Sequence, residues 1–222
     1  MPQQPQRRSY DASGRRAQAQ ANRERVLDAA RGLFVRQGYA GTSIADIAGA
    51  AGVSVPTVFA HFGSKVTLFK ECVESALVGD AAPVPLAERP EMMHVREGRT
   101  AEEVFSRFAA LIAAAGPRVV PISMVMYGAA DSDTEIRSLA RLMDEHRLTG
   151  ATQLARIVMD RIGSRPDTDD ANLLSEIRDL IWTMNSPMTF SLLVTERGWS
   201  VERYQAWVCR TLTAAISGPL PT

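Results

Sequence analysis

Cysteine and lysine are scarce in this sequence of 222 residues, which contains two residues of each type. The two cysteines, Cys72 and Cys209, do not indicate a disulfide framework, and they are typical of a chain kept in a reducing compartment. The first residues, MPQQPQRRSYDASGRR, also lack the apolar stretch of a secretory signal. We therefore expect a cytoplasmic protein.

Long uninterrupted apolar runs are missing too. The longest candidate, residues 108–130, is interrupted by Gly116, Pro117, Arg118 and Pro121. A spanning helix needs about 20 consecutive apolar residues. We therefore expect the pieces on either side of these residues to be buried core helices, and we expect no membrane partner.

The patterns of catalytic and metal sites are absent as well. There is no nucleophile elbow, phosphate loop or dinucleotide fingerprint. His94 lies between Glu91 and Glu97, and His146 follows two acidic residues, but neither spacing places two ligands on one helix face. We interpret both as solvated charge and expect no enzyme, no metal and no cofactor.

The alternation of apolar and polar residues that marks β-strands occurs nowhere in the chain. Apolar residues recur instead at steps of three and four, the period of a helix with one buried face. These patterns predict an all-α chain of about nine helices.

The formal net charge of zero hides an asymmetry between the two parts of the chain. Residues 1–70 contain ten Lys and Arg against four Asp and Glu, whereas residues 71–222 contain fifteen against twenty-one. A basic first third favours an anionic partner such as a nucleic-acid backbone, and the acidic remainder should avoid one.

The first 79 residues divide into an arm and four helices. Residues 1–20 are rich in Gln, Arg, Pro and Ala with little to bury, so we expect a flexible basic arm. The following helices are marked by glycines at their ends and by Thr or Ser at their starts. They are expected at about residues 22–37, 43–51, 54–62 and 64–79, so that residues 21–79 form one domain with its connecting helix.

Residues 80–99 contain three prolines and a glycine, which predicts a linker. Residues 100–222 then form a second, larger helical domain, opened by a capping box at Thr100 and Glu103. Pro187, which follows Asn185 and Ser186, should kink or interrupt the third of the later helices. After the helix that starts at Thr100, the expected spans are 119–129, 133–162, 169–195 and 200–217.

Residues 42–62 have the pattern of a helix-turn-helix, in which the second helix enters the major groove. Ser54 can cap that helix, and Val58 and Phe62 face inward while Thr57, Phe59 and His61 project outward. The alternative is a helical corner packed for its own sake. The basic charge of these residues and the arginine arm before them favour the nucleic-acid interpretation.

Lys65 stands at the start of the next helix, where a cation opposes the helix dipole. If a phosphate docks there, the free backbone N–H groups and the ammonium both favour it. Lys65 is therefore a candidate phosphate ligand.

The same segment resembles the TetR family of bacterial transcriptional regulators over roughly residues 22–70. The matching residues are Arg23, Ala29-Ala30, Leu33-Phe34, Gly38-Tyr39, Thr42, Ile47-Ala48, Ala51-Gly52-Val53-Ser54, Thr57, His61-Phe62, Ser64-Lys65 and Leu68. The resemblance implies a homodimeric repressor or activator that binds a near-palindromic operator in double-stranded DNA and is released or engaged by a small molecule.

The resemblance also implies roles for single residues. Thr42 and Lys65 would hold phosphates, His61 would make a further backbone contact, and the helix that starts after Ser54 would read bases. Phe59 stands where the family usually has tyrosine. With Val55, Pro56 and Phe59 at the groove, we expect readout weighted toward thymine methyl groups and DNA shape. The predicted DNA-binding residues are Thr42, Ser54, Val55, Pro56, Thr57, Phe59, His61 and Lys65.

The arm carries Arg7, Arg8, Arg15 and Arg16. These arginines either enter an adjacent minor groove, as in other helix-turn-helix proteins, or belong to a tail that only keeps the protein soluble.

The larger domain is expected to form the dimer and to hold the effector. Its last two long helices carry wide apolar stripes that can pair with their two-fold mates, and two DNA half-sites require two copies. Adaptable and aromatic side chains gather near the two expected kinks, with little charge, which suggests an apolar or weakly polar ligand. The candidates are Met124, Met126, Tyr127, Trp182, Met184, Asn185, Met188 and Phe190, and the predicted site consists of Met124, Tyr127, Trp182, Met184, Asn185 and Met188.

Three functions are therefore open at this point. The first is a ligand-responsive, DNA-binding regulator that acts as a homodimer, most simply a repressor released by a small apolar effector. The second is a DNA-binding dimer that answers to a protein partner or to no effector. The third is an all-α enzyme with an incidental helix-turn-helix.

Overall fold

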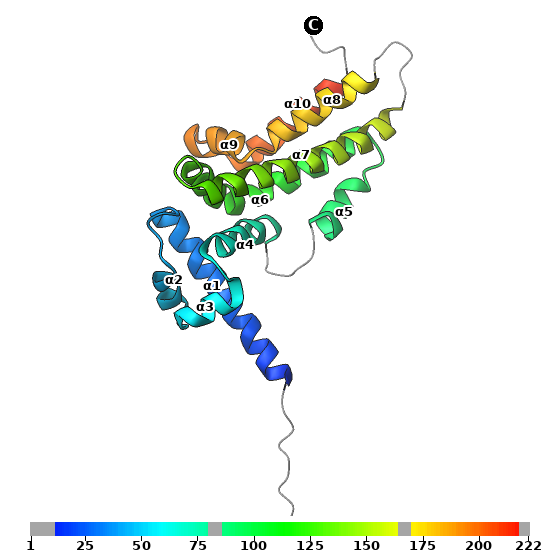
Figure 1. Cartoon of the computed structure of the whole chain (residues 1–222). Coiled ribbons are helices and arrows are strands. Elements are labelled where there is room, and N and C mark those ends of the chain that lie inside the picture. Colours follow the sequence, from blue (N-terminus) through cyan, green and yellow to red (C-terminus); the bar gives the residue numbers. More distant parts are fainter. Residues whose placement is uncertain (1–11, 80–85, 164–169, 218–222) are drawn as a thin grey trace, which may run out of the picture. The chain divides into compact units, whose positions relative to one another are not determined.

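The computed structural model describes residues 12–79, 86–163 and 170–217. These residues form ten α-helices, one 3₁₀ turn and one π-helical segment, with no strand among them (Figure 1). The all-α prediction is confirmed. The chain divides into two compact units, residues 1–69 and 70–222, so the boundary lies inside helix α4 (Lys65–Val78) and before the predicted one at residue 79.

The first unit contains α1 (Ala12–Gln37), α2 (Ile44–Ala51), α3 (Val55–Phe62) and the first turns of α4. Three aromatic rings form the centre of its core. Phe34 meets the edge of Phe69 at 4.9 Å between centroids, and Tyr39 lies 5.8 Å from Phe34 and 5.2 Å from Phe69. This cluster ties the end of α1 to α4.

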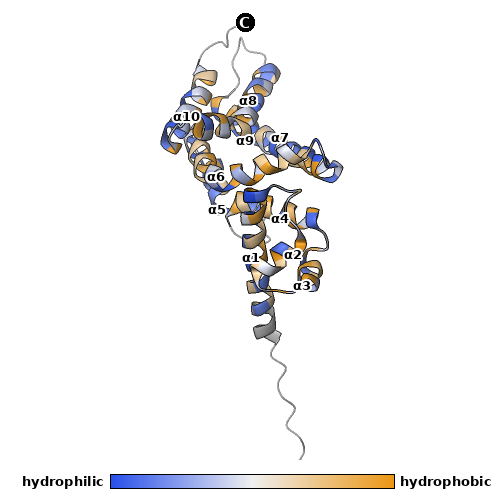
Figure 2. Ribbon diagram, turned by 90° about the vertical axis from the view of Figure 1, so that its left-hand side faces the viewer, coloured by the Kyte–Doolittle hydropathy of each residue, from blue (hydrophilic) through white to orange (hydrophobic). Residues whose placement is uncertain are grey.

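Helix α1 begins at Ala12, so the predicted arm does not hold for residues 12–20, and residues 1–11 lie outside the described residues. After its first turn, the N-terminal residues of α1 are mostly hydrophilic (Figure 2). They are also rich in Ala, Gln and Arg, which are good helix formers, and extending an existing helix costs far less than starting one. The expectation of an arm rested on missing apolar residues and overlooked this propensity.

The second unit contains the end of α4, η1 (Leu86–Glu88) and helices α5 to α10. Part of the predicted linker 80–99 is helical, because α5 (Pro90–Arg96) occupies it. Pro90 stands at the first helical position, where a missing N–H costs little, and Val95 is buried in the core of the unit. Proline content alone was therefore a misleading guide here.

Helix α6 (Ala101–Ala129) runs without a break through Pro117 and Pro121, which contradicts the expected interruption at residues 116–121. Both prolines are exposed, and the carbonyl that Pro121 leaves without a donor belongs to exposed Pro117, where water can reach it, whereas Ala113, four residues before Pro117, is buried. The helix contacts α5, α7 (Thr134–Ile162), α9 (Pro187–Phe190) and α10 (Val201–Ser217). Burial against these neighbours offsets the two lost hydrogen bonds.

Of the described helices, α6 alone is long and apolar enough to cross a membrane, judged by length and composition. Nearly half of its most apolar window, 44%, is buried inside the protein. Its apolar character is therefore accounted for by its central position in the second unit.

The predicted interruption after Asn185 is confirmed. Helix α8 (Asp170–Met184) ends there, and α9 and the π-helical segment η2 (Ser191–Glu196) follow. Side chains from three other helices donate hydrogen bonds to the last backbone carbonyls of α8. Arg147 donates to Trp182 at 2.6 Å, Thr189 to Thr183 at 2.8 Å and Tyr204 to Met184 at 2.5 Å.

These hydrogen bonds connect the end of α8 to α7, α9 and α10.

Candidate functional site

The chain bends by 104° between α2 and α3, within the range of about 90–120° that a helix-turn-helix adopts. Each helix has its own cap. Ser43 and Asp46 form a reciprocal capping box on α2, and Gly52 ends α2 in the left-handed region with φ 66°. Ser54 then caps α3. The predicted turn and both helix starts are confirmed, and Ser43 is the cap of the first of these helices.

The capping box also fixes the charge of Asp46. Hydrogen bonds from the hydroxyl and the backbone N–H of Ser43 hold the pKa of the Asp46 carboxyl below its usual value. The carboxylate therefore stays ionised, and the box stays intact, down to a lower pH than a free aspartate would allow.

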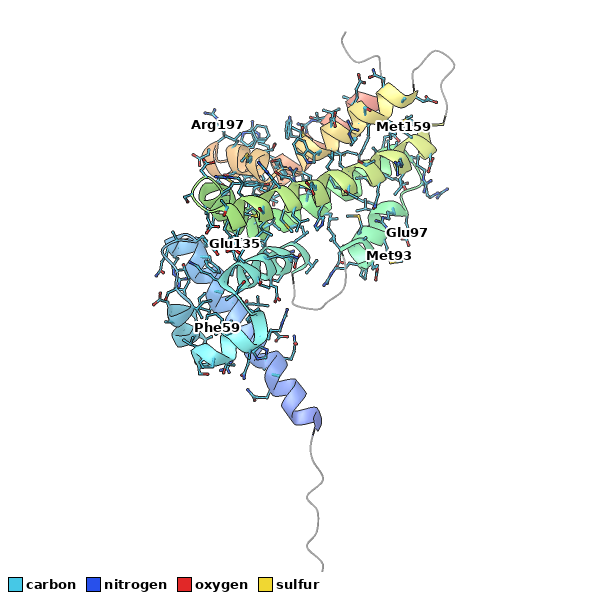
Figure 3. All side chains as sticks on the ribbon, in the orientation of Figure 1. Phe59, Met93, Glu97, Glu135, Met159 and Arg197 are labelled. Atoms are coloured by element: carbon cyan, nitrogen blue, oxygen red, sulfur yellow. The ribbon has the colours of Figure 1, made fainter. Side chains whose placement is uncertain are left out.

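Helix α3 has a buried face and an outward face, as predicted. Val58 and Phe62 are 1% and 3% exposed, whereas the Phe59 ring, labelled in Figure 3, is 48% exposed. Val55 is half-buried and Pro56 is exposed. The outward face therefore offers apolar surface to a partner and no arginine, lysine, asparagine or glutamine.

Two hydroxyl groups lie at the start of that face. The oxygens of Ser54 and Thr57 are 2.8 Å apart, and the Thr57 backbone N–H donates to Ser54 at 3.3 Å. Only one of the two hydroxyl protons can lie between the two oxygens. The other proton is directed elsewhere, so the pair can still donate to a phosphate or a base.

Lys65 is held at the first position of α4 by an aromatic ring. Its Nζ atom lies 4.2 Å from the centroid of Tyr39, whose ring is 7% exposed and belongs to the aromatic cluster of the core. Ser64 caps the helix by accepting from the backbone N–H of Thr67 at 3.1 Å. The ring attracts the ammonium and offsets part of the dipole penalty, so the cation is held where a phosphate would meet α4.

The sequence pattern predicted Lys65 as a phosphate ligand but indicated no role for Tyr39, which appeared only among the residues that match the TetR family. It missed Arg23 in the same way. The Arg23 guanidinium lies 5.6 Å from the Phe62 ring, at the end of α3. His61 is half-buried in the last turn of the same helix, with its ring 6.1 Å from that of Phe62.

Thr42 does not fit its predicted role. The residue is 1% exposed, and its hydroxyl donates to the Gly38 carbonyl at 2.9 Å. This bond ties the end of α1 to the start of α2 and leaves almost no Thr42 surface for a phosphate. The burial of a threonine next to a helix cap depends on how α1 ends, which the sequence pattern did not reveal.

Two arginines of the predicted arm, Arg7 and Arg8, lie outside the described residues, and Arg15 and Arg16 lie in the first turns of α1.

The predicted effector residues do not form one site. Met184 is 7% exposed and belongs to the core, whereas Met124 and Met188 are 37% and 47% exposed. Tyr127 and Trp182 belong to a polar network instead of a pocket. Of the six predicted residues, only Asn185 lines the cavity described below.

The polar network joins α6, α7 and α8. The Tyr127 hydroxyl donates to Asp144 at 2.8 Å, and Arg147 donates to the same oxygen at 3.1 Å while its guanidinium lies 4.8 Å from the Trp182 ring centroid. Burial, and then the hydrogen bond to Asp144, raise the pKa of Tyr127 well above its usual range. The Tyr127 phenol is thus neutral, and the network serves to connect three helices.

The second unit contains a cavity of about 70 Å³, which we call the α6–α9 cavity. Its walls come from α6, from the break between α8 and α9, from α10 and from the ends of α4, η1 and α5. They consist of Leu77, Leu86, Met92, Phe108, Leu111, Ile112, Ala115, Gly116, Val119, Val120, Asn185, Ser186, Pro187, Phe190 and Tyr204. Phe190, a weaker candidate of the sequence analysis, is among them.

No group of three or more His, Cys, Asp or Glu residues that could hold a metal ion occurs in residues 12–79, 86–163 and 170–217.

Comparisons with known proteins agree with the geometry of the first unit. Residues 26–72 match the family described as "Bacterial regulatory proteins, tetR family". The chain is 44% identical over 57 residues to the HTH-type transcriptional regulator AcrR of Shigella flexneri, covering 26% of each protein. It is 40% identical over 53 residues to the HTH-type transcriptional repressor ComR of Escherichia coli (strain K12), covering 24% of this chain and 25% of ComR.

These matches span about a quarter of the length of the two curated relatives. Solved structures extend the likeness of the fold. A regulator assigned to the TetR family from Mesorhizobium loti superposes with a TM-score of 0.64 at 20% identity, covering 90% of this chain and 96% of that one. FadR of Bacillus subtilis, solved in complex with stearoyl-CoA, gives a TM-score of 0.58 at 18% identity over 86% and 98% of the two chains.

At these identities the two solved structures establish the fold alone. The family's sequence pattern lies in the first unit, and regulators assigned to that family share the fold over most of the chain. Residues 26–72 therefore match the tetR family of bacterial regulatory proteins, and the chain shares its fold with regulators assigned to that family.

Proposed function

We propose that this chain is a DNA-binding transcriptional regulator that acts in the cytoplasm as a homodimer. It binds a near-palindromic operator, represses transcription and is released by a small, mostly apolar effector. The repressor role is supported by the similarity to ComR, a transcriptional repressor that is 40% identical to this chain over 53 residues. Release from DNA by a bound effector is supported by FadR, a structural relative solved in complex with stearoyl-CoA.

The observation that carries the proposal is the position of Lys65. Its ammonium lies 4.2 Å from the ring of a buried tyrosine, at the start of a capped helix. A cation held at this point loses little entropy when a phosphate binds, and backbone N–H groups at the helix start favour the same anion. The exposed face of α3, with Phe59 and the hydroxyl pair, then meets the adjacent groove.

The composition of that face determines the expected operator. Helix α3 has no side chain that makes a bidentate hydrogen bond with guanine or adenine. Val55, Pro56 and Phe59 instead offer apolar contacts to thymine methyl groups, and the rest of the specificity comes from DNA shape. Selecting binding sites from a pool of random duplexes tests this directly. Enrichment of positions that require guanine would contradict it.

The short length of the recognition helix supports a dimer. Helix α3 spans eight residues, too few to read a long operator, and paired half-sites lie about 34–36 Å apart on one face of DNA. The apolar stripes of α8 and α10 are buried in the core of the unit, so we assign the two-fold contact to partly exposed residues of these helices, such as Leu174, Leu180 and Trp207. Light scattering at micromolar concentration should give twice the mass of the 24.2 kDa chain, and a monomer would overturn the assignment.

The arginines of the arm extend the proposed interface. Arg7 and Arg8 would reach an adjacent minor groove, where arginine side chains are attracted by the narrow, electronegative groove. Deleting residues 1–11 should then lower the salt dependence of DNA affinity. An unchanged salt slope would leave these arginines outside the interface.

A second candidate function is favoured by the size of the α6–α9 cavity. At about 70 Å³ it is well below the roughly 300–1,000 Å³ of typical ligand pockets. The second unit would then answer to a protein partner or to no effector. Thermal unfolding against a broad panel of metabolites separates the two cases, because a regulator without effector would give no shift with any compound.

A further inference from the structure

Three polar residues interrupt the apolar wall of the α6–α9 cavity, and two of them are already hydrogen-bonded. Ser186 accepts from the backbone N–H of Met188 at 3.2 Å, and the Tyr204 hydroxyl donates to the Met184 carbonyl at 2.5 Å. The Asn185 carboxamide makes no hydrogen bond with any residue in the described part of the chain. It offers a donor and an acceptor to a molecule in the cavity.

Charge is excluded from this wall. None of the residues that line the cavity is an arginine, lysine, aspartate or glutamate. Moving an ionised group into such surroundings without a partner is strongly unfavourable. The part of a molecule that is buried in the cavity must therefore be neutral.

One side chain limits the length of such a molecule. Phe190 is 5% exposed and packs edge to face on Tyr204 at 4.9 Å between centroids. Its ring occupies the space that Gly116 leaves open, since a Cβ atom on Gly116 would overlap the ring. Phe190 thus fills the part of the cavity that adjoins the middle of α6.

We propose that the α6–α9 cavity binds an uncharged, mainly aliphatic molecule through one amide, alcohol or carbonyl group paired with Asn185. Phe190, seated against Gly116, sets the upper limit of its size. The inference rests on the proposed effector response, because it names the chemical class of that effector and the residue that selects it.

Butanamide and butanoate test the polar end of the site, because they share a short aliphatic chain and differ in charge. Titration of the full chain, followed by calorimetry and by thermal unfolding, should detect binding of butanamide and no binding of butanoate. The variant Asn185→Leu keeps a similar shape and removes one hydrogen bond, so it should weaken butanamide binding by about threefold to tenfold. Asn172→Leu, the same change at an exposed position of α8, is the matched control and should bind as the unchanged chain does.

Hexanamide tests the size limit. The variant Phe190→Leu enlarges the cavity and should raise the affinity for hexanamide relative to butanamide. If this variant does not fold, the preference of the unchanged chain for butanamide over hexanamide provides the same information.

The proposal is overturned if butanoate binds as well as butanamide, if neither binds, or if Asn185→Leu and Asn172→Leu behave alike. DNA binding measured on the same samples keeps the two proposals apart. A chain that binds butanamide but no duplex DNA would refute the regulator and leave the cavity site standing, and the reverse result would refute the cavity site alone.

Discussion

At the scale of single residues, Phe59 is the clearest departure from the family that the sequence resembles, which usually has tyrosine at this position. The ring is 48% exposed on α3, so a hydroxyl added to it would stay in water or meet DNA. Phe59→Tyr should therefore leave stability unchanged and strengthen DNA binding by about threefold to tenfold, the contribution of one hydrogen bond to phosphate. Affinity measured on selected and scrambled duplexes checks this, and both should gain equally. A gain confined to one sequence would mean that the phenol reads a base.

Arg147 is expected to stabilise the fold by connecting α7 to α8. Its side chain is 14% exposed and donates to the Trp182 carbonyl and to Asp144. Arg147→Lys cannot satisfy both acceptors with the same geometry, so the free energy of unfolding should fall by about 1–3 kcal/mol. Arg141→Lys on the same helix is exposed and should stay within about 0.5 kcal/mol of the unchanged chain. Urea unfolding followed by tryptophan fluorescence measures both. Equal stability of the two variants would show that the network contributes little.

At the scale of elements, two glycines of the helix-turn-helix have opposite roles. Gly52 ends α2 with φ 66°, where a side chain is strained although nothing lies within 4 Å of an added Cβ. Gly49 lies inside α2 with equally open surroundings and no positive φ. Gly52→Ala should lower the free energy of unfolding by about 1 kcal/mol, whereas Gly49→Ala should raise it by about 0.5–1 kcal/mol. Far-ultraviolet circular dichroism during urea unfolding can separate the two. The same sign for both would contradict the assigned cap.

Elements with local sequence rules were predictable. The caps Ser54 and Ser64, the left-handed Gly38 and Gly52, and the break after Asn185 all follow from a residue type at a fixed position, and the structure contains them. The continuity of α6 was not predictable in this way. Whether its two prolines end the helix depends on the burial of that helix among four others, and a window of sequence does not contain that information.

In the candidate site, too, some residues follow from local sequence patterns and others depend on tertiary contacts. The outward residues of α3 and the position of Lys65 follow from helix periodicity, so they were named from the sequence. The Tyr39 ring under Lys65 and the buried hydroxyl of Thr42 depend on how α1 meets its neighbours. Five of the six predicted effector residues lie outside the α6–α9 cavity for a similar reason, because apolar and aromatic side chains near a kink also form the core, as Met184 does.

At the scale of the whole molecule, the basic first third and the acidic remainder predict how salt acts on the protein. Residues 1–70 carry ten basic against four acidic side chains, and residues 71–222 carry fifteen against twenty-one. Only the first part should contact the DNA backbone, so affinity should fall with salt according to the phosphate contacts of that part alone.

The central claim is that Lys65 at the start of α4 binds a phosphate of duplex DNA, and the salt dependence of affinity tests it most directly. Lys65→Gln and Lys70→Gln each remove one positive charge from α4, but Lys70 pairs with Glu74 at 3.7 Å and serves as the control. The slope of the logarithm of affinity against that of salt should flatten by about 0.9 per protomer in Lys65→Gln and stay unchanged in Lys70→Gln. Equal slopes and equal affinities for both variants and the unchanged chain would contradict the account.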